Sequence, residues 1–232
     1  MSLLFDRFRS IQEKIANTLD RLGRDPASVR IVAVSKTQPI DVLREAVQEK
    51  IRLFGENRVQ EAEEKIQALH GAAIEWHFIG RLQTNKVNKV VGSFRLIHSV
   101  DRPKLVQKLQ EEAEKRGQQQ EILLQVNLSR EETKSGVRLE EFGLLVDSVR
   151  HAPNLLCRGL MTIPPPVADP EESRGYFSCL RELAERHRCD FLAPHSPLEL
   201  SMGMSQDYLV AVEEGATLVR IGTAIFGPRL DA

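Results

Sequence analysis

The stretch Ile31-Val-Ala-Val-Ser35 is a short apolar run that ends directly before a lysine, Lys36. A run of this length between amphipathic segments is typical of a strand buried on both faces. Seven further candidate strands follow, and a longer segment with helical spacing separates each strand from the next. This alternation predicts βα repeats around a parallel sheet.

The predicted strands divide the chain into eight similar units. Eight units over about 205 residues give roughly 26 residues per unit, near the lower end for a (β/α)8 barrel. A doubly wound open sheet also suits the alternation, but even units that end directly after the last strand favour a closed TIM-type barrel. The predicted strands are Ile31–Ser35, Leu53–Glu56, Trp76–Ile79, Leu96–Ser99, Ile122–Asn127, Cys157–Thr162, Leu198–Ser201 and Leu218–Ile221.

Helical segments are expected before and between these strands. An apolar stripe predicts an extra N-terminal helix, and Asp101 is predicted to cap the helix that begins at Pro103, with Gly117 just past its end. No composition break marks a second domain, so we expect one barrel domain over residues 1–232. The predicted helices between strands are Ile40–Lys50, Val59–Leu69, Asn85–Val91, Pro103–Arg116, Leu139–His151, Glu171–His187 and Gln206–Glu214.

The composition restricts partners and location. A formal net charge of -1 over 232 residues leaves no global basic field, so neither nucleic acid nor a membrane is expected as a partner. The three cysteines form no Cys-x-x-Cys pair and are expected to be reduced. The start of the chain lacks the apolar core of a signal peptide, and no later stretch has the roughly 20 apolar residues of a membrane span. We therefore expect a cytoplasmic protein.

Lys36 is the first candidate for chemistry, because active sites in such barrels lie at the carboxyl ends of the strands. Apolar surroundings lower the pKa of a lysine amine and make it a better nucleophile toward an aldehyde. Taken alone, however, a lysine that ends a strand is more often a solvated charge at the rim.

Two further strand ends resemble phosphate sites. Ser201-Met-Gly-Met-Ser205 ends the seventh strand and Arg220-Ile-Gly-Thr223 ends the eighth, and phosphate is commonly held at these positions. Ser201 and Thr223 offer hydroxyl groups, and Gly222 offers bare backbone. Small residues also form simple turns, but their combination with Lys36 predicts pyridoxal 5′-phosphate (PLP), bound as a Schiff base on that lysine.

Arg220 ends an otherwise apolar strand, where a guanidinium needs a partner or a ligand. Facing PLP, it would donate to the pyridine nitrogen and leave that nitrogen unprotonated, which weakens the ring as an electron sink. A salt bridge to a rim carboxylate is the alternative. Asn57 either hydrogen-bonds the ring hydroxyl of the cofactor or fixes its own loop. His77 lies within an apolar strand, so we interpret it as a hydrogen-bonded core histidine rather than as a catalytic base.

Common motifs of other site types are absent from the sequence. There is no H-E-x-x-H and no clustered Cys/His set, so no metal site is predicted. Neither of the two common nucleotide-binding motifs, G-x-x-x-x-G-K-[ST] and G-x-G-x-x-G after a strand, occurs in the sequence. There is also no G-x-S-x-G motif of a serine hydrolase.

Several stretches together resemble the YggS/PROSC family of pyridoxal phosphate homeostasis (PLP-binding) proteins, and the likeness runs from the first strand to the last. The stretches are Ala33-Val-Ser-Lys36, Phe54-Gly-Glu-Asn-Arg-Val-Gln-Glu61, Trp76-His-Phe-Ile-Gly-Arg-Leu-Gln-Thr-Asn-Lys86, Gly159-Leu-Met-Thr162, Leu200-Ser-Met-Gly-Met-Ser-Gln-Asp207 and Val219-Arg-Ile-Gly-Thr-Ala-Ile-Phe-Gly227.

The resemblance implies a barrel similar to the barrel domain of alanine racemase, with PLP on Lys36. It also implies that Arg220 faces the pyridine nitrogen and that Ser201, Gly222 and Thr223 hold the phosphate. The family is associated with the intracellular balance of vitamin B6 and of amino and keto acids, without an established catalytic activity.

The alternative function is a PLP-dependent amino-acid racemase or another PLP enzyme. Two-base racemisation needs an acid/base group on each face of the substrate, and the racemases that the barrel resembles supply a tyrosine from an additional domain across a dimer. The sequence ends five residues after Gly227, and its two tyrosines, Tyr176 and Tyr208, fall in predicted outer helices. We therefore expect a monomeric PLP carrier without turnover, with PLP-dependent apoenzymes as candidate recipients and Lys134 as the alternative attachment point.

Overall fold

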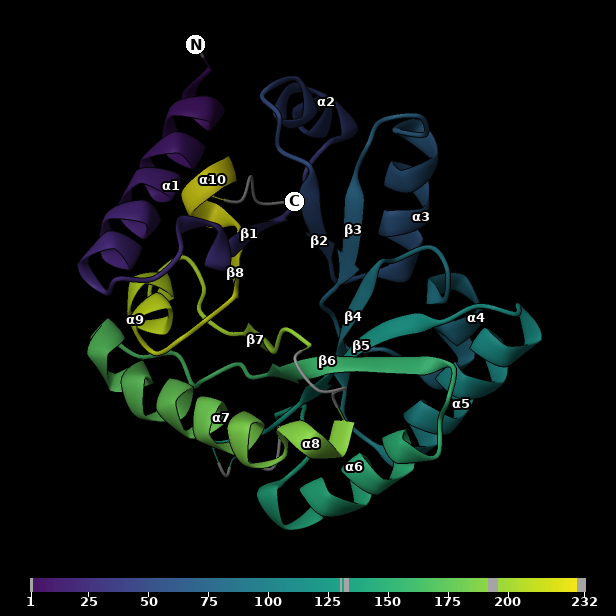
Figure 1. Ribbon diagram of the computed structural model, residues 1–232. Helices are drawn as coiled ribbons and strands as arrows, with labels where there is room; N and C mark the ends of the chain where they lie inside the picture. The colour runs from purple at the N-terminus through teal and green to yellow at the C-terminus, as the bar shows by residue number, and fades with distance from the viewer. Residues whose placement is uncertain (1, 130, 132–133, 192–195, 229–232) are drawn as a thin grey trace.

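The computed structural model describes residues 2–129, 131, 134–191 and 196–228. Eight parallel strands close into a barrel in which each strand pairs with the next and β8 pairs with β1. Figure 1 shows the strands at the centre with the helices around them. The strands are β1 Arg30–Val34, β2 Leu53–Glu56, β3 Glu75–Phe78, β4 Leu96–Val100, β5 Gln120–Gln125, β6 Leu155–Met161, β7 Glu199–Ser201 and β8 Leu218–Ile221.

The prediction of a (β/α)8 barrel is confirmed. The bounds of β2 and β8 are as predicted, and the other strands begin or end one or two residues away from the predicted positions. The helices are α1 Leu3–Arg21, α2 Ile40–Gln48, α3 Val59–Ala68, α4 Val87–Val90, α5 Pro103–Lys115, α6 Phe142–Arg150, α7 Arg174–Arg186, α8 Arg188–Phe191, α9 Tyr208–Glu213 and α10 Thr223–Phe226.

Some helical segments differ from the prediction. The short helices α8 and α10 were not predicted, and the segments before α4, α6 and α7 form 3-10 turns. The predicted cap of α5 is wrong, because the N-cap residue is Arg102 and not Asp101. Pro103 excludes helical backbone from the residue before it, so Arg102 is extended and Asp101 lies one residue too early. Gly117 lies just past the end of α5, as predicted, and its backbone is in the left-handed conformation.

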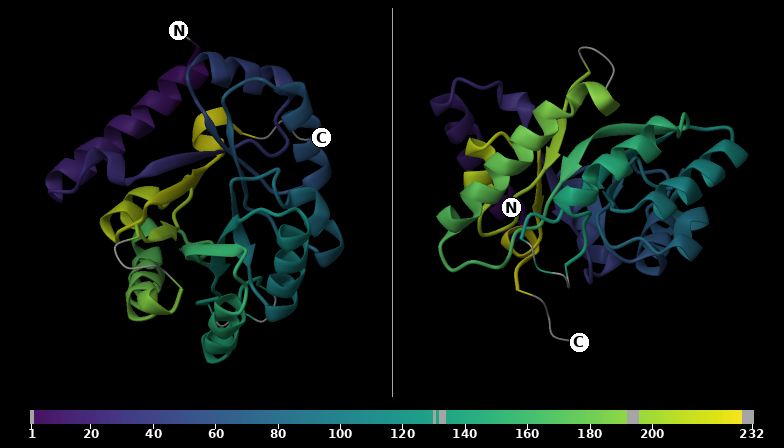
Figure 2. Two further views of the ribbon diagram at one scale, coloured as in Figure 1. Left: turned by 45° about the vertical axis from the view of Figure 1, so that its right-hand side comes forward. Right: turned by 90° about the horizontal axis from the view of Figure 1, so that it is seen from below.

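The N-terminal helix α1 packs against the last helices of the described chain. It packs against α9 and α10, and Figures 1 and 2 show it beside these last elements of the barrel. Ile11, Ile15 and Leu19 are buried on one face of α1, as its apolar stripe predicted. None of the helices in the described part of the chain is long and apolar enough to cross a bilayer.

The hydrophobic core has two parts. The larger part lies between the strands and the surrounding helices, and a smaller cluster that includes Val32, Leu123 and Leu218 fills the barrel interior. Alternation along a strand puts residues two apart on the same side, so Leu96 and His98 both point inward, as do Leu218 and Arg220. The barrel interior therefore contains the polar side chains of His98 and Arg220 beside the smaller apolar cluster.

Candidate functional site

A cavity of about 470 Å³ opens at the carboxyl ends of the strands. Its lining comes from the ends of β1, β2, β3 and β8 and from the loops after β5, β6 and β7. Five of the six predicted site residues line this cavity: Lys36, Asn57, Arg220, Gly222 and Thr223.

The backbone on both sides of Lys36 is held by buried and partly buried polar groups. The Ser35 hydroxyl donates to Glu56 Oε1 at 2.6 Å, and the Thr37 N–H donates to Glu61 Oε1 at 2.5 Å. Thr37 also has a positive φ of 64°, which is rare for a β-branched residue. The turn after β1 is therefore held on both sides of Lys36.

Lys65 connects these groups. Its ammonium donates to the Ser35 carbonyl at 2.6 Å, to Glu56 Oε1 at 2.7 Å and to Glu61 Oε1 at 2.6 Å. Lys65 is only 3% exposed and Glu56 is fully buried. Burial raises the pKa of Glu56, and the hydrogen bond from Lys65 opposes that rise. This group was not predicted, although a glutamate that ends an apolar strand was an available signal.

Arg220 is almost completely buried and is fixed by two acceptors. Its Nη1 donates to Ser201 Oγ at 2.6 Å and its Nη2 donates to the Thr162 carbonyl at 2.8 Å. Burial lowers the pKa of Arg220 to about 10, so the guanidinium remains charged at neutral pH. Among the described residues no carboxylate forms an ion pair with Arg220, so the alternative of a salt bridge at the rim is not observed.

Ser201 differs from the other predicted site residues, because it does not belong to the cavity lining described above. It is fully buried, and its Oγ lies 2.8 Å from His98 Nδ1 while it accepts from Arg220. Its contact with the cofactor's phosphate therefore stays a prediction, whereas its contact with Arg220 is direct. His98 was not predicted as a partner of Ser201.

His77 is a hydrogen-bonded core histidine, as predicted. It is fully buried, its Nδ1 lies 2.9 Å from His98 Nε2, and its Nε2 lies 2.8 Å from Glu75 Oε1. Burial lowers the pKa of both histidines, so both rings are neutral at neutral pH.

Asn57 lines the cavity and has an unsatisfied acceptor. Its Oδ1 is buried and has no hydrogen-bond partner within the described ranges. A buried carbonyl oxygen without a donor is costly, and its contact with the ring hydroxyl of the cofactor stays a prediction.

The predicted phosphate end of the cavity is formed by small residues. Gly222 is the N-cap of α10 and Thr223 is its first residue, so the positive end of this short helix faces the same region. Ser205 also lines the cavity, and its Oγ accepts from the Ala224 N–H at 3.4 Å. Ser205 was part of the predicted motif at the end of the seventh strand, and no role was predicted for it.

Lys134 is not part of the described lining of this cavity. Its ammonium lies 3.2 Å from the Glu131 carboxylate. Within the described ranges, no group of three or more His, Cys, Asp or Glu side chains is placed to hold a metal ion.

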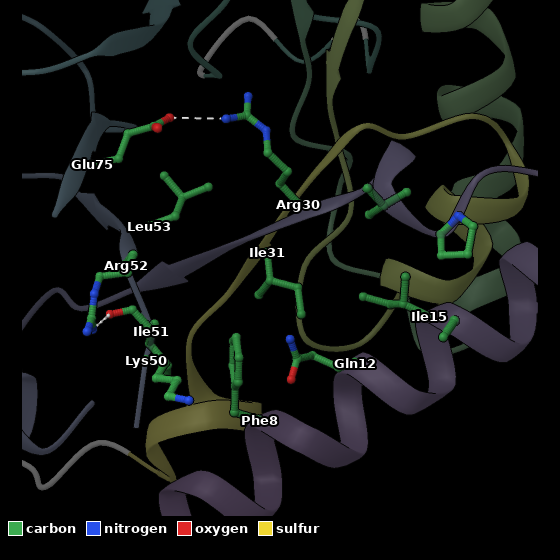
Figure 3. Close-up of a pocket in the computed structure, with 13 residues that line it drawn as sticks. Phe8, Gln12, Ile15, Arg30, Ile31, Lys50, Ile51, Arg52, Leu53 and Glu75 are labelled. Carbon is green, nitrogen blue, oxygen red and sulfur yellow. Dashed lines mark hydrogen bonds and ion pairs between the residues drawn. The ribbon is translucent and has the colours of Figure 1, made fainter. Parts of the chain in front are cut away.

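Two of the other cavities lie at the amino ends of the strands, away from the predicted site residues. One, of about 490 Å³, has apolar walls from α1 and β1, and Figure 3 shows the Arg30–Glu75 ion pair at its edge. The other, of about 450 Å³, is lined by His77 and by charged side chains that include Glu75, Glu199 and Arg30. Both contain residues from the amino ends of strands, opposite Lys36.

Comparisons with known proteins agree with this geometry. The profile of the family described as "Alanine racemase, N-terminal domain" matches residues 9–229. The pyridoxal phosphate homeostasis protein of Aquifex aeolicus is 45% identical over 226 residues, 97% of each chain. That of Pseudomonas aeruginosa is 42% identical and covers 99% of this chain and 97% of its own.

Solved structures give the same result. The structure of PipY from Synechococcus elongatus with PLP bound has a TM-score of 0.80 and 38% identity, and covers 92% of this chain and 100% of PipY. Alanine racemase from Corynebacterium glutamicum shares the fold, with a TM-score of 0.69 at 14% identity over 98% of this chain and 62% of the racemase. The resemblance found in the sequence is therefore confirmed, and the chain belongs to the family of pyridoxal phosphate homeostasis proteins.

Proposed function

We propose that this protein binds PLP as a Schiff base on Lys36 and takes part in PLP and amino/keto acid homeostasis without catalytic turnover. The observation that carries the proposal is the meeting of Lys36, Asn57 and Arg220 in one cavity. The chemistry of these groups fits PLP, which offers an aldehyde, a ring nitrogen and a ring hydroxyl. PipY, solved with PLP bound, supports the same cofactor.

Each residue has a defined task in this proposal. The Lys36 amine attaches the cofactor, Arg220 donates to the ring nitrogen, and Asn57 Oδ1 accepts from the ring hydroxyl. Gly222 and Thr223 hold the phosphate, and Ser201 acts on Arg220 from inside the barrel. When bound, PLP supplies an electron sink, which an arginine at the ring nitrogen weakens because the nitrogen stays unprotonated.

The positions of the two tyrosines support the proposed absence of turnover. Racemisation needs a second acid/base group opposite the lysine. Tyr176 lies in α7 and Tyr208 is buried in α9, and neither belongs to the described lining of the cavity. A racemase or another PLP enzyme remains the alternative, since the fold is shared with alanine racemase.

The test is absorbance of the purified protein with PLP, borohydride reduction, and peptide mapping of the modified lysine. We expect an imine band and a label on Lys36, both lost in Lys36→Ala and both retained in the matched variant Lys134→Ala. A label that stays in Lys36→Ala would overturn the attachment site. Appreciable racemisation of D- or L-alanine by the loaded protein would overturn the carrier function.

We extend the proposal to the form in which the protein acts. The described elements from α1 to α10 all belong to one barrel, which supports a single domain over residues 1–232. We propose that it acts as a cytoplasmic monomer and passes PLP to PLP-dependent apoenzymes. Sedimentation with and without PLP tests the monomer, and reactivation of an apoenzyme by the loaded protein tests the transfer.

A further inference from the structure

A continuous line of hydrogen bonds crosses the barrel interior from Arg220 to Glu75. It passes from Arg220 to Ser201, to His98, to His77 and to Glu75, over successive distances of 2.6, 2.8, 2.9 and 2.8 Å. The participants come from β8, β7, β4 and β3. Since β4 and β7 do not pair with each other in the closed barrel, the bond between His98 and Ser201 spans the interior.

The two ends of this line fix the direction of every bond in it. A guanidinium has only donors, so Arg220 donates to Ser201 Oγ. A carboxylate has only acceptors, so Glu75 accepts from His77 Nε2–H. Each neutral ring has one donor and one acceptor nitrogen, so His77 Nδ1 accepts from His98 Nε2–H, and His98 Nδ1 accepts from the Ser201 hydroxyl.

The reverse direction requires an extra buried charge or a displaced proton. If His98 donated to Ser201, His77 would donate to His98, and its Nε2 would meet Glu75 without a proton. That arrangement needs a protonated Glu75 or a doubly protonated His77. The pKa of Glu75 is lowered, first by the hydrogen bond from His77, and burial lowers the pKa of His77, so both are disfavoured.

The direction matters at the cavity because of Ser201. A Ser201 hydroxyl that donates to His98 keeps its lone pairs for Arg220, and aligned hydrogen bonds strengthen one another in a low-dielectric interior. With the reverse direction, Ser201 Oγ would accept from both His98 and Arg220, and its own proton would have no acceptor within the line.

We propose that Glu75, His77, His98 and Ser201 are positioning residues, which together hold Arg220 as the hydrogen-bond donor to the ring nitrogen of the bound cofactor. The cofactor part of this inference rests on the proposed function. The line holds the guanidinium in place and does not conduct protons, because passing a proton from Arg220 to Glu75 would leave a neutral guanidine at one end and a protonated acid at the other.

Glu199 offers a matched control for Glu75, because both carboxylates pair with Arg30. Arg30 donates to Glu75 Oε1 at 3.1 Å and to Glu199 Oε1 at 2.9 Å. Figure 3 shows the first of these contacts. Only Glu75 among the two carboxylates is bonded to His77. Replacing either glutamate removes one partner of Arg30, whereas replacing Glu75 alone removes the end of the line.

The first experiment needs no cofactor. Long-range ¹H–¹⁵N spectra of the ¹⁵N-labelled protein at neutral pH report the tautomer of each histidine. We expect His77 and His98 both as neutral rings with the proton on Nε2. A proton on Nδ1 of His98, or a charged ring at either position, would contradict the proposed direction.

The second experiment compares PLP with an analogue in which carbon replaces the ring nitrogen. We expect Glu75→Leu to weaken PLP binding by at least about fivefold, the lower range of coupling between distant sites, and to leave the analogue unchanged. Glu199→Leu should leave both ligands unchanged. The inference would be overturned if Glu75→Leu weakened the binding of PLP and of the analogue equally, or left PLP binding unchanged. It would also be overturned if Glu199→Leu showed the same selective loss of PLP binding. If the wild type bound no PLP, the proposed function would fail, and the ligand-free spectra would still decide the direction of the line.

Discussion

Replacing Lys65 by methionine should destabilise the protein strongly, because it leaves the Glu56 carboxylate buried without its cation. The Lys65 ammonium has three acceptors within 2.7 Å, and its side chain is 4% exposed. Removing one partner of a buried ion pair costs about 3–5 kcal/mol. With a urea m-value of about 3 kcal/mol/M, this loss lowers the unfolding midpoint by about 1 to 1.7 M.

The effect should depend on pH with a defined sign. Burial raises the pKa of Glu56 in the folded state, and without Lys65 that pKa should rise further. A carboxyl group whose pKa is raised on folding does not reduce the free energy of unfolding below its unfolded pKa, because it is protonated in both states. As the pH rises from the unfolded pKa through the folded pKa, the free energy of unfolding falls. The deficit of Lys65→Met should therefore shrink between about pH 7 and about pH 5.

Urea unfolding followed by circular dichroism, and by the fluorescence of the single, buried Trp76, measures this loss. The matched control is Lys89→Met, because Lys89 pairs with Glu63 at 2.7 Å while its side chain is 40% exposed, and such a pair contributes at most about 1 kcal/mol. The double variant Lys65→Met/Glu56→Gln should recover part of the stability. A deficit for Lys65→Met no larger than that of Lys89→Met, or one that grows on acidification, would refute the reasoning.

Two further predictions concern glycine and histidine. Gly159 has a φ of 149° and an added Cβ would lie 2.0 Å from the Glu199 carbonyl oxygen, so Gly159→Ala should cost about 3 kcal/mol or more in urea unfolding. Gly143→Ala, in α6 with nothing within 4 Å of the added Cβ, should raise stability by up to about 1 kcal/mol, and similar effects at both positions would contradict the packing described. Because burial lowers the pKa of His77 and His98, their stabilising effect is complete above about pH 6.5 and is lost below it, by up to about 1.4 kcal/mol per pH unit for each ring. His98→Gln should reduce that slope in unfolding measured between about pH 6.5 and about pH 5.5, and an unchanged slope would exclude this ring as its source.

The barrel was predictable because its signals are local. Each strand is an apolar run, each long helix carries an apolar stripe, and their even alternation restricts the topology. The short helices α8 and α10 span only four residues each, too few for a helical period to show. The error at Asp101 arose because the capping preference was considered without the restriction that Pro103 places on the residue before it.

The site was predictable where a residue type is informative by itself. Lys36, Arg220 and the glycine turn at Gly222 stand at strand ends, and the closure of the barrel brings them to one cavity. The roles of Lys65 and His98 were not predicted, because they depend on partners from other elements of the fold. His98 meets Ser201 across 103 positions of sequence, and Lys65 looks in the sequence like an ordinary surface partner of Glu61 four residues earlier.

The closure between β1 and β8 has a consequence for biosynthesis. Arg30 in β1 pairs with Leu218 in β8, and α1 packs on α9 and α10, so the earliest of the described elements are completed by the latest ones. The nascent chain must hold the apolar faces of α1 and β1 without their partners until α9, β8 and α10 have been translated. Lys36 is made well before the loop that carries Gly222 and Thr223. Loading with cofactor is therefore expected only after β8 and that loop have left the ribosome.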